Sequence, residues 1–275
     1  MKFTPGKMNS NMWALVIFSL VFAVVYKFSL WYASQLGEVS SFVFDFEHNI
    51  PFLPWTIIPY LSSGFFFIVV FLLIESDEDL KIFLKRVLLM VFFAGLGFIL
   101  FPLQYSYPKP EIDNNFYASL FWFLDGVDDP YNQSPSLHVA FAFAFWTVFR
   151  EIKSPWKNIA GFWLILVALS TLTTFQHHLI DVFTGSLLAH FVFILVPSRQ
   201  NNFGIRNQHL ANFYYLFGWI SLLISFLLAK YFGNGWYNLS WFSALLFIGG
   251  YLCQKFSILY LRSDVIRIKN IRRFL

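Results

Sequence analysis

The chain has 275 residues, of which 58% are hydrophobic and only 12% are charged. This composition is too apolar for a soluble domain and is typical of proteins that cross a membrane several times. The net charge of +4 does not indicate nucleic-acid binding, because the basic residues fall in short loops and at the C-terminus rather than on one soluble face. We therefore expect membrane lipids as partners and no nucleic acid, with the oligomeric state left open.

Apolar stretches of about 20 residues, the length that crosses one bilayer core, recur along the chain. The first is longer than the apolar core of a cleavable signal peptide. The stretches lie near residues 13–33, 55–75, 83–103, 136–150, 157–176, 179–197, 210–230 and 239–261. The sequence predicts an all-α, polytopic membrane helix bundle of about eight transmembrane helices, with residues 1–275 forming a single membrane domain.

Shorter signals lie between these stretches. Segment 38–54 is typical of a short interfacial helix that leads into the second span. Ser76 precedes three acidic residues, a pattern that starts helices, and it is expected to cap the third span. In the same way, Ser134 is expected to cap a helix whose first residue is Pro135.

The basic residues also predict the topology, because cytoplasmic segments of membrane proteins are enriched in lysine and arginine. With the N-terminus inside, the inner segments hold 15 of the 19 basic residues, whereas the outer loops are acidic. Both termini are therefore predicted to be cytoplasmic. In this topology His138 and His177 lie at the same outer face of the membrane, although nothing in the charge count required it.

Three titratable groups, His177, His178 and Asp181, stand between two apolar stretches where membrane burial does not call for them. Ionisable groups at such positions are costly and indicate function. If His177 and Asp181 share the first helical turn, they lie on one face, about 6 Å apart along the axis. The carboxylate can then fix the tautomer of His177 and leave its other nitrogen nucleophilic. The alternative is an aspartate that only satisfies a buried histidine.

The run Ser134 to His138 has its own chemistry, because the free N–H groups of a helix start attract anions. A protonated His138 one turn further in can donate a proton to the oxygen that leaves a phosphate. The alternative is an interfacial histidine at a helix start. Two histidines and one carboxylate are the parts of a phosphoryl-transfer site.

The sequence resembles the type-2 phosphatidic acid phosphatase superfamily, which includes lipid phosphate phosphatases and vanadium haloperoxidases. Pro135-Ser136-Leu137-His138 is similar to the Pro-Ser-x-His signature, and Ser170 to Asp181 is similar to Ser-Arg-x5-His-x3-Asp. Within the superfamily the chain resembles a bacterial branch near the inositol phosphorylceramide synthases. That likeness is carried by Phe101-Pro102-Leu103, Asp128-Asp129-Pro130-Tyr131-Asn132-Gln133 and Gln176-His177-His178.

The resemblance covers roughly residues 50–197, and it implies a six-helix phosphatase-like core. Residues 198–275 would then add two C-terminal transmembrane helices and a basic cytoplasmic tail. It also implies that His177 attacks phosphorus to form a phosphohistidine, that Asp181 orients His177, and that His138 protonates the leaving alcohol. The residues implied to bind substrate are Ser136, Lys109, Asn132, Gln133, His178 and Ser170.

Two departures weaken the cationic part of the signature. Its Lys-x6-Arg-Pro motif survives only as Lys109-Pro110, and Thr171 stands where the family has arginine. Phosphoryl transfer depends on cations that clamp the equatorial oxygens. A less positive site suits a phosphodiester or another headgroup better than a dianionic monoester.

These observations predict a lipid phosphatase or phosphotransferase of the bacterial inner membrane, with its site facing the periplasm or exterior. Neither a metal nor a cofactor is expected. One alternative is a metal-dependent membrane enzyme that uses His138, His177, His178 and Asp181 as ligands. Another is a transporter or scaffold whose polar cluster lines a permeation path.

Overall fold

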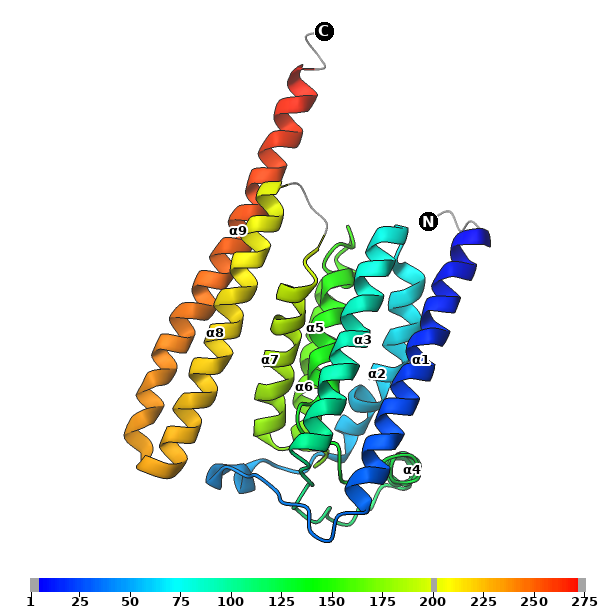
Figure 1. Ribbon diagram of the computed structural model, residues 1–275, viewed down its shortest axis with the longest axis vertical. Coiled ribbons are helices and arrows are strands. Elements are labelled where there is room, and N and C mark those ends of the chain that lie inside the picture. Colours follow the sequence, from blue (N-terminus) through cyan, green and yellow to red (C-terminus); the bar gives the residue numbers. More distant parts are fainter. Residues whose placement is uncertain (1–4, 199–201, 272–275) are drawn as a thin grey trace. The chain divides into compact units, whose positions relative to one another are not determined.

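The chain is helical almost throughout (Figure 1), and the computed structural model describes residues 5–198 and 202–271. Helices predominate because a backbone in hydrocarbon must satisfy its own hydrogen bonds. The elements are α1 (Pro5–Ser34), η1 (Asp45–Asn49), η2 (Pro54–Thr56), α2 (Ile57–Leu73), α3 (Asp77–Leu100), α4 (Asn115–Asp125), α5 (Leu137–Phe149), α6 (Trp156–Thr173), α7 (Leu179–Leu195), α8 (Asn202–Phe232), η3 (Asn234–Leu239) and α9 (Ser240–Ile271).

An α-helix occupies each of the eight apolar stretches, which confirms the predicted all-α membrane bundle. Within the described residues, five helices are long and apolar enough to cross a membrane, and α5 and α7 are shorter apolar helices. Helix α4, in the loop after α3, was not predicted. Lys2, Arg199, Arg272 and Arg273, which contribute to the predicted topology, lie outside the described residues.

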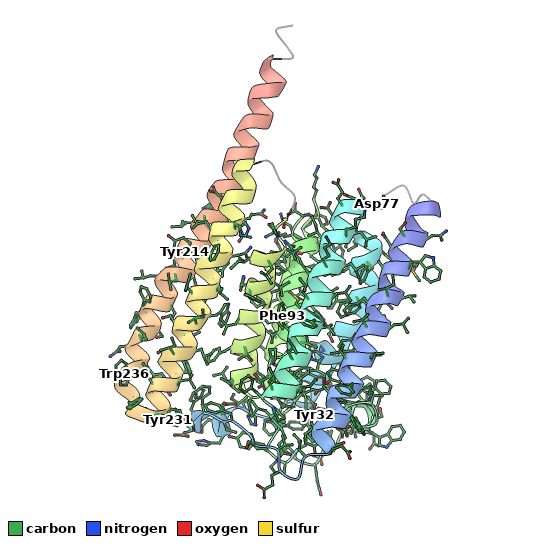
Figure 2. All side chains as sticks on the ribbon, viewed as in Figure 1. Tyr32, Asp77, Phe93, Tyr214, Tyr231 and Trp236 are labelled. Atoms are coloured by element: carbon green, nitrogen blue, oxygen red, sulfur yellow. The ribbon has the colours of Figure 1, made fainter. Side chains whose placement is uncertain are left out.

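The chain divides into two compact units, Met1–Ala189 and His190–Leu275, where the sequence predicted one membrane domain. The division falls within α7. In the first unit, α5 packs against α2, α3 and α6, while α1 packs against α2 and α3. Tyr32 near the end of α1 and Asp77 at the start of α3 lie at opposite ends of this unit (Figure 2). Segments 35–53 and 101–136 lie at the end that carries Tyr32 (Figure 1).

Aromatic side chains fill the interface between α1, α2 and α5. The ring centroid of Phe67 lies 4.2 Å from that of Phe18, 4.8 Å from that of Phe141 and 4.7 Å from that of Phe145. Aromatic pairs at these separations attract one another beyond the apolar area that they bury. The many phenylalanines therefore form part of the packing of this unit in addition to facing lipid.

Local chemistry sets the helix starts. The predicted cap of α3 is confirmed, because the Ser76 hydroxyl accepts a hydrogen bond from the backbone N–H of Asp79. The predicted start of α5 is wrong, because Ser136 is the N-cap residue and Pro135 precedes the helix. The hydroxyl of Ser134 instead lies 2.7 Å from that of Thr184 in α7. The run before His138 is thus held by a neighbouring helix rather than by its own cap.

Two glycines allow neighbouring helices to approach the start of α5. A Cβ on Gly185 of α7 would collide with the carbonyl oxygen of Ser136, and one on Gly97 of α3 would lie 2.8 Å from Cδ of Pro135. The backbone N–H of Ser136 donates to the carbonyl oxygen of Asp181 at 3.0 Å. Helices α3 and α7 therefore enclose the residues that lead into His138.

The second unit is built mainly from α8 and α9, which pack along each other and are joined by η3. The hydroxyl of Ser225 in α8 donates to the carbonyl oxygen of Trp236 in η3 at 2.9 Å, which fastens this turn to the helix. Figure 2 shows Tyr231 and Trp236 together at the turn. In α9, side chains are described only as far as Lys255.

Candidate active site

The two histidines predicted to converge do so. His138 lies on the first turn of α5, His177 lies in the loop between α6 and α7, and their ring centroids are 6.0 Å apart. The ring of Tyr60 in α2 stacks on His138 with a centroid separation of 4.1 Å. The backbone N–H of His177 donates to the carbonyl oxygen of Thr171 at 2.9 Å, which fixes the loop. The prediction that both imidazoles reach one end of the bundle is therefore confirmed.

Asp181 holds His177 from the first turn of α7. Its Oδ2 lies 3.3 Å from Nδ1 of His177 and accepts a hydrogen bond of 2.8 Å from the backbone N–H of His178. Asp181 is fully buried and His177 is 7% exposed. With the proton on Nδ1 facing the carboxylate, Nε2 of His177 keeps its lone pair and can act as a nucleophile or base.

His178 faces away from this pair. Its Nε2 accepts a hydrogen bond from the backbone N–H of Ser106 at 3.3 Å, so Nδ1 carries the proton and donates to Oε2 of Glu47 at 3.1 Å. The ring of Tyr105 stacks on it with centroids 4.4 Å apart. Both ring nitrogens are therefore engaged within the protein, which leaves His178 no free nitrogen for a substrate.

Glu47 is the residue of this network that the sequence did not single out. Besides His178, its carboxylate accepts hydrogen bonds from the backbone N–H of Leu179 at 3.0 Å and from that of Phe44 at 2.8 Å. It is 3% exposed. Burial, and next the nearby Glu47 carboxylate, raise the pKa of Tyr105 well above its usual range, so the phenol stays neutral. Glu47 thus links segment 35–53 to the start of α7, the helix that carries Asp181.

Four other predicted substrate-binding residues differ in their hydrogen-bond and ion-pair partners. Ser136 is fully buried and its hydroxyl has no partner among the described residues. The hydroxyl of Ser170 donates to the carbonyl oxygen of Val167, and the amide of Gln133 donates to the carbonyl oxygen of Pro130. Lys109 forms a 2.6 Å ion pair with Asp125 in α4. None of these four residues lines the cavity described below.

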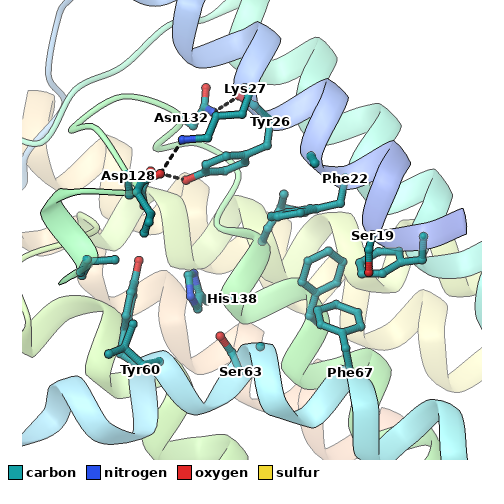
Figure 3. A pocket seen from close by; sticks show the side chains of 18 of the residues that line it. Ser19, Phe22, Tyr26, Lys27, Tyr60, Ser63, Phe67, Asp128, Asn132 and His138 are labelled. Atoms are coloured by element: carbon teal, nitrogen blue, oxygen red, sulfur yellow. Dashed lines mark hydrogen bonds between the residues drawn. The ribbon is translucent and has the colours of Figure 1, made fainter. Parts of the chain in front are cut away.

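A cavity of about 620 Å³ opens beside the two histidines (Figure 3). Its lining includes Asp128 and Asn132, together with His138 and the neighbouring His177, and these residues define what we call its polar end. The remaining walls are mainly apolar and come from α1 and α2, with further residues from α3 to α5. They comprise Leu15, Phe18, Ser19, Phe22, Ala23, Tyr26, Lys27, Tyr60, Leu61, Ser63, Gly64, Phe67, Ile68, Phe98, Leu124, Val127, Leu137 and Phe141.

The loop between α4 and α5 closes the polar end of the cavity. Asp128 accepts a 2.8 Å hydrogen bond from the hydroxyl of Tyr26, and the side-chain amide of Asn132 donates to the carbonyl oxygen of Tyr26 at 3.0 Å. Oδ1 of Asn132 is buried with no partner in the described chain. Burial raises the pKa of Asp128, and the hydrogen bond from Tyr26 opposes this shift. Asp128 belongs to the motif that carries the resemblance, but it was not among the predicted substrate-binding residues.

The set proposed for a metal enzyme does not gather around one point. Among the side chains that the structure describes, no group of three or more from histidine, cysteine, aspartate and glutamate is placed to hold a metal ion. His178 in particular is turned toward Glu47 and Ser106.

The fold and the site define a helical membrane protein with a histidine–aspartate pair and a second histidine beside an apolar cavity. Residues 83–205 match the family model described as the PAP2 superfamily. This match supports the type-2 phosphatidic acid phosphatase superfamily and a phosphatase-type membrane enzyme. The matched segment contains His138, His177 and Asp181 and begins after α1 and α2. No curated protein and no solved structure matches the chain.

Proposed function

We propose that the protein removes or transfers the phosphoryl group of a membrane lipid phosphate through a phosphohistidine intermediate. The observation that carries this proposal is the position of His138 and His177, with ring centroids 6.0 Å apart, at the polar end of an apolar cavity. The PAP2 superfamily match over the same segment supports it independently.

In the proposed reaction, the lone pair on Nε2 of His177 attacks phosphorus, and the bond to the lipid oxygen breaks. The Asp181 carboxylate, 3.3 Å from Nδ1, stabilises the positive charge that the ring acquires. His138 gives its proton to the departing alkoxide. Water, or a second alcohol, then gives its proton to His138 and takes the phosphoryl group, which restores His177.

The shape and lining of the cavity favour a lipid as substrate. Its polar end can hold a phosphate ester, whereas Phe18, Phe22, Phe67 and Phe141 line the part that runs between α1, α2 and α5. Transfer of hydrocarbon against such rings is favourable at roughly 0.8 kcal/mol for each methylene removed from water.

The finer assignments belong to the same proposal. The pattern Asp128-Asp129-Pro130-Tyr131-Asn132-Gln133 resembles the bacterial branch near the inositol phosphorylceramide synthases and favours transfer to an alcohol as the second step. We propose a metal-independent reaction at the outer face of the inner membrane, with both termini cytoplasmic. The charge asymmetry of the loops supports this orientation.

The test uses the purified full-length protein in detergent. Phosphate release is measured from phosphatidate, undecaprenyl diphosphate, phosphatidylglycerol phosphate and phosphoinositol lipids, with and without an alcohol acceptor. We expect turnover of at least one lipid, inhibition by vanadate, persistence in EDTA, and loss of turnover in His177→Ala.

The matched control is His48→Ala, because His48 is an exposed histidine of the same outer region. Turnover that persists in His177→Ala would eliminate the phosphohistidine. Tracer flux across proteoliposomes without any phosphate release would instead favour the transporter alternative.

A further inference from the structure

The matched segment departs from the family signature at the cations that the resemblance implies for phosphate binding. Thr171 stands where the family signature has arginine, and it is fully buried. Lys109, the basic residue that remains of the first signature, is paired with Asp125 at 2.6 Å and does not line the cavity. A transferring phosphoryl group carries charge on its equatorial oxygens, and it requires a positive partner to stabilise that charge.

Lys27 of α1 is the one lysine or arginine among the described residues that line the cavity. It lies seven residues before the end of α1, within the candidate span Asn9–Ser34. A charged side chain in a membrane-crossing helix is costly and is a functional candidate unless it only extends to the interface.

The ammonium group of Lys27 is held at the cavity. Its Nζ donates a 2.6 Å hydrogen bond to the carbonyl oxygen of Val127, and Val127 also lines the cavity. Tyr26 and Asn132 make the two further bonds between α1 and this loop. Figure 3 shows the side chains of Lys27 and Tyr26 both directed toward Asp128.

Most of the donor capacity of Lys27 remains available. An ammonium group has three protons, and the bond to Val127 uses one of them. No carboxylate of the described chain lies within ion-pair distance of Lys27, although Asp128 interacts with it at longer range. The two remaining protons of the ammonium group are therefore available to an anion.

We propose that Lys27 supplies the cation that binds a phosphate oxygen of the substrate, in place of the lysine and arginine that the matched segment lacks. This inference rests on the proposed function and assigns the phosphate contact to α1, which lies outside residues 83–205. The lysine gives charge-assisted hydrogen bonds to the phosphate. His177 remains the nucleophile, and His138 remains the proton donor.

The experiment measures vanadate binding to the purified full-length protein by isothermal titration calorimetry. Vanadate adopts the five-coordinate geometry of phosphoryl transfer. Its affinity therefore reports how strongly Lys27 binds the phosphate oxygens, whichever lipid is the natural substrate. Loss of one charge-assisted bond in Lys27→Met is expected to raise the Kd by about tenfold or more. Lys27→Arg keeps the charge and is expected to stay close to the wild type.

Lys81→Met is the matched control, because Lys81 is an exposed lysine near the opposite end of the unit, in the first turns of α3. Its Kd is expected to equal that of the wild type. If the wild type binds vanadate and releases lipid phosphate while Lys27→Met binds as tightly, the inference about Lys27 is wrong and the proposed function stands. If the wild type neither binds vanadate nor releases phosphate, the proposed function itself fails.

A second measurement needs no variant. The wild-type protein is acetylated with acetic anhydride in the presence and absence of saturating vanadate, and modification of each lysine is quantified by mass spectrometry. Lys27 is expected to be protected by vanadate, whereas Lys81 is expected to react equally in both samples. Equal acetylation of Lys27 with and without bound vanadate would overturn the inference even if Lys27→Met fails to fold.

Discussion

Replacement of Glu47 by alanine is expected to destabilise the end of the first unit at which the two histidines meet. The carboxylate accepts hydrogen bonds from the backbone N–H groups of Phe44 and Leu179 and from Nδ1 of His178, at 2.8, 3.0 and 3.1 Å. Glu47 and His178 are 3% and 2% exposed, so water does not readily replace the lost acceptor. Each buried donor left unpaired costs about 1–3 kcal/mol, so the total is at least about 3 kcal/mol.

For a chain of this size, that loss corresponds to a fall in melting temperature of about 6 °C or more. The assay is thermal unfolding of the full-length protein in detergent, followed by intrinsic tryptophan fluorescence. Glu38→Ala is the control, because Glu38 is an exposed glutamate of the same segment, residues 35–53. A melting temperature of Glu47→Ala equal to that of Glu38→Ala would refute the reasoning, because it would mean that the three donors find other partners.

Three further outcomes are expected. Asp181→Asn cannot hold the His177 tautomer and is expected to lower kcat by at least about 100-fold with KM little changed, measured as lipid phosphate release; undiminished turnover would contradict this role. Gly185→Val is expected to lower the melting temperature because its side chain meets the Ser136 carbonyl, whereas Gly235→Ala, with open space around its Cβ position, should not. Gly64→Leu, which extends into the cavity, is expected to reduce lipid turnover by about tenfold or more while hydrolysis of p-nitrophenyl phosphate is retained. Equal losses for both substrates would show that the cavity does not hold the lipid tail.

The helices and the proximity of His138 and His177 were predictable from the sequence. Each depends on patterns within short segments or on counts of residues summed over the loops. Runs of apolar residues report membrane spans directly, and the basic residues set the direction of each span. The direction of the spans places His138 and His177 at the same end of the helices. The four-residue spacing of His177 and Asp181 indicates that these two residues are in contact.

The parts of the site that were not predicted depend on contacts between distant residues. Glu47 and Glu38 look alike in the sequence, yet Glu47 is buried against His178, which lies 131 residues further along the chain. Lys27 lies within the first predicted span, and its place at the cavity was not predicted because its partner Val127 is 100 residues away. Likewise, Ser134 has the pattern of a helix cap but lies against Thr184, a residue of a helix that local sequence does not bring near it.

The cavity draws its walls largely from α1 and α2, whereas His138, His177 and Asp181 belong to the later segment matched by the family model. On the proposed function, the nucleophile and its acid would therefore be encoded in the later segment, and most of the contacts to the lipid tail in the first two helices. Substitutions in α1 and α2 that leave Tyr26 and Lys27 in place would then change the preferred lipid tail without changing the nucleophile.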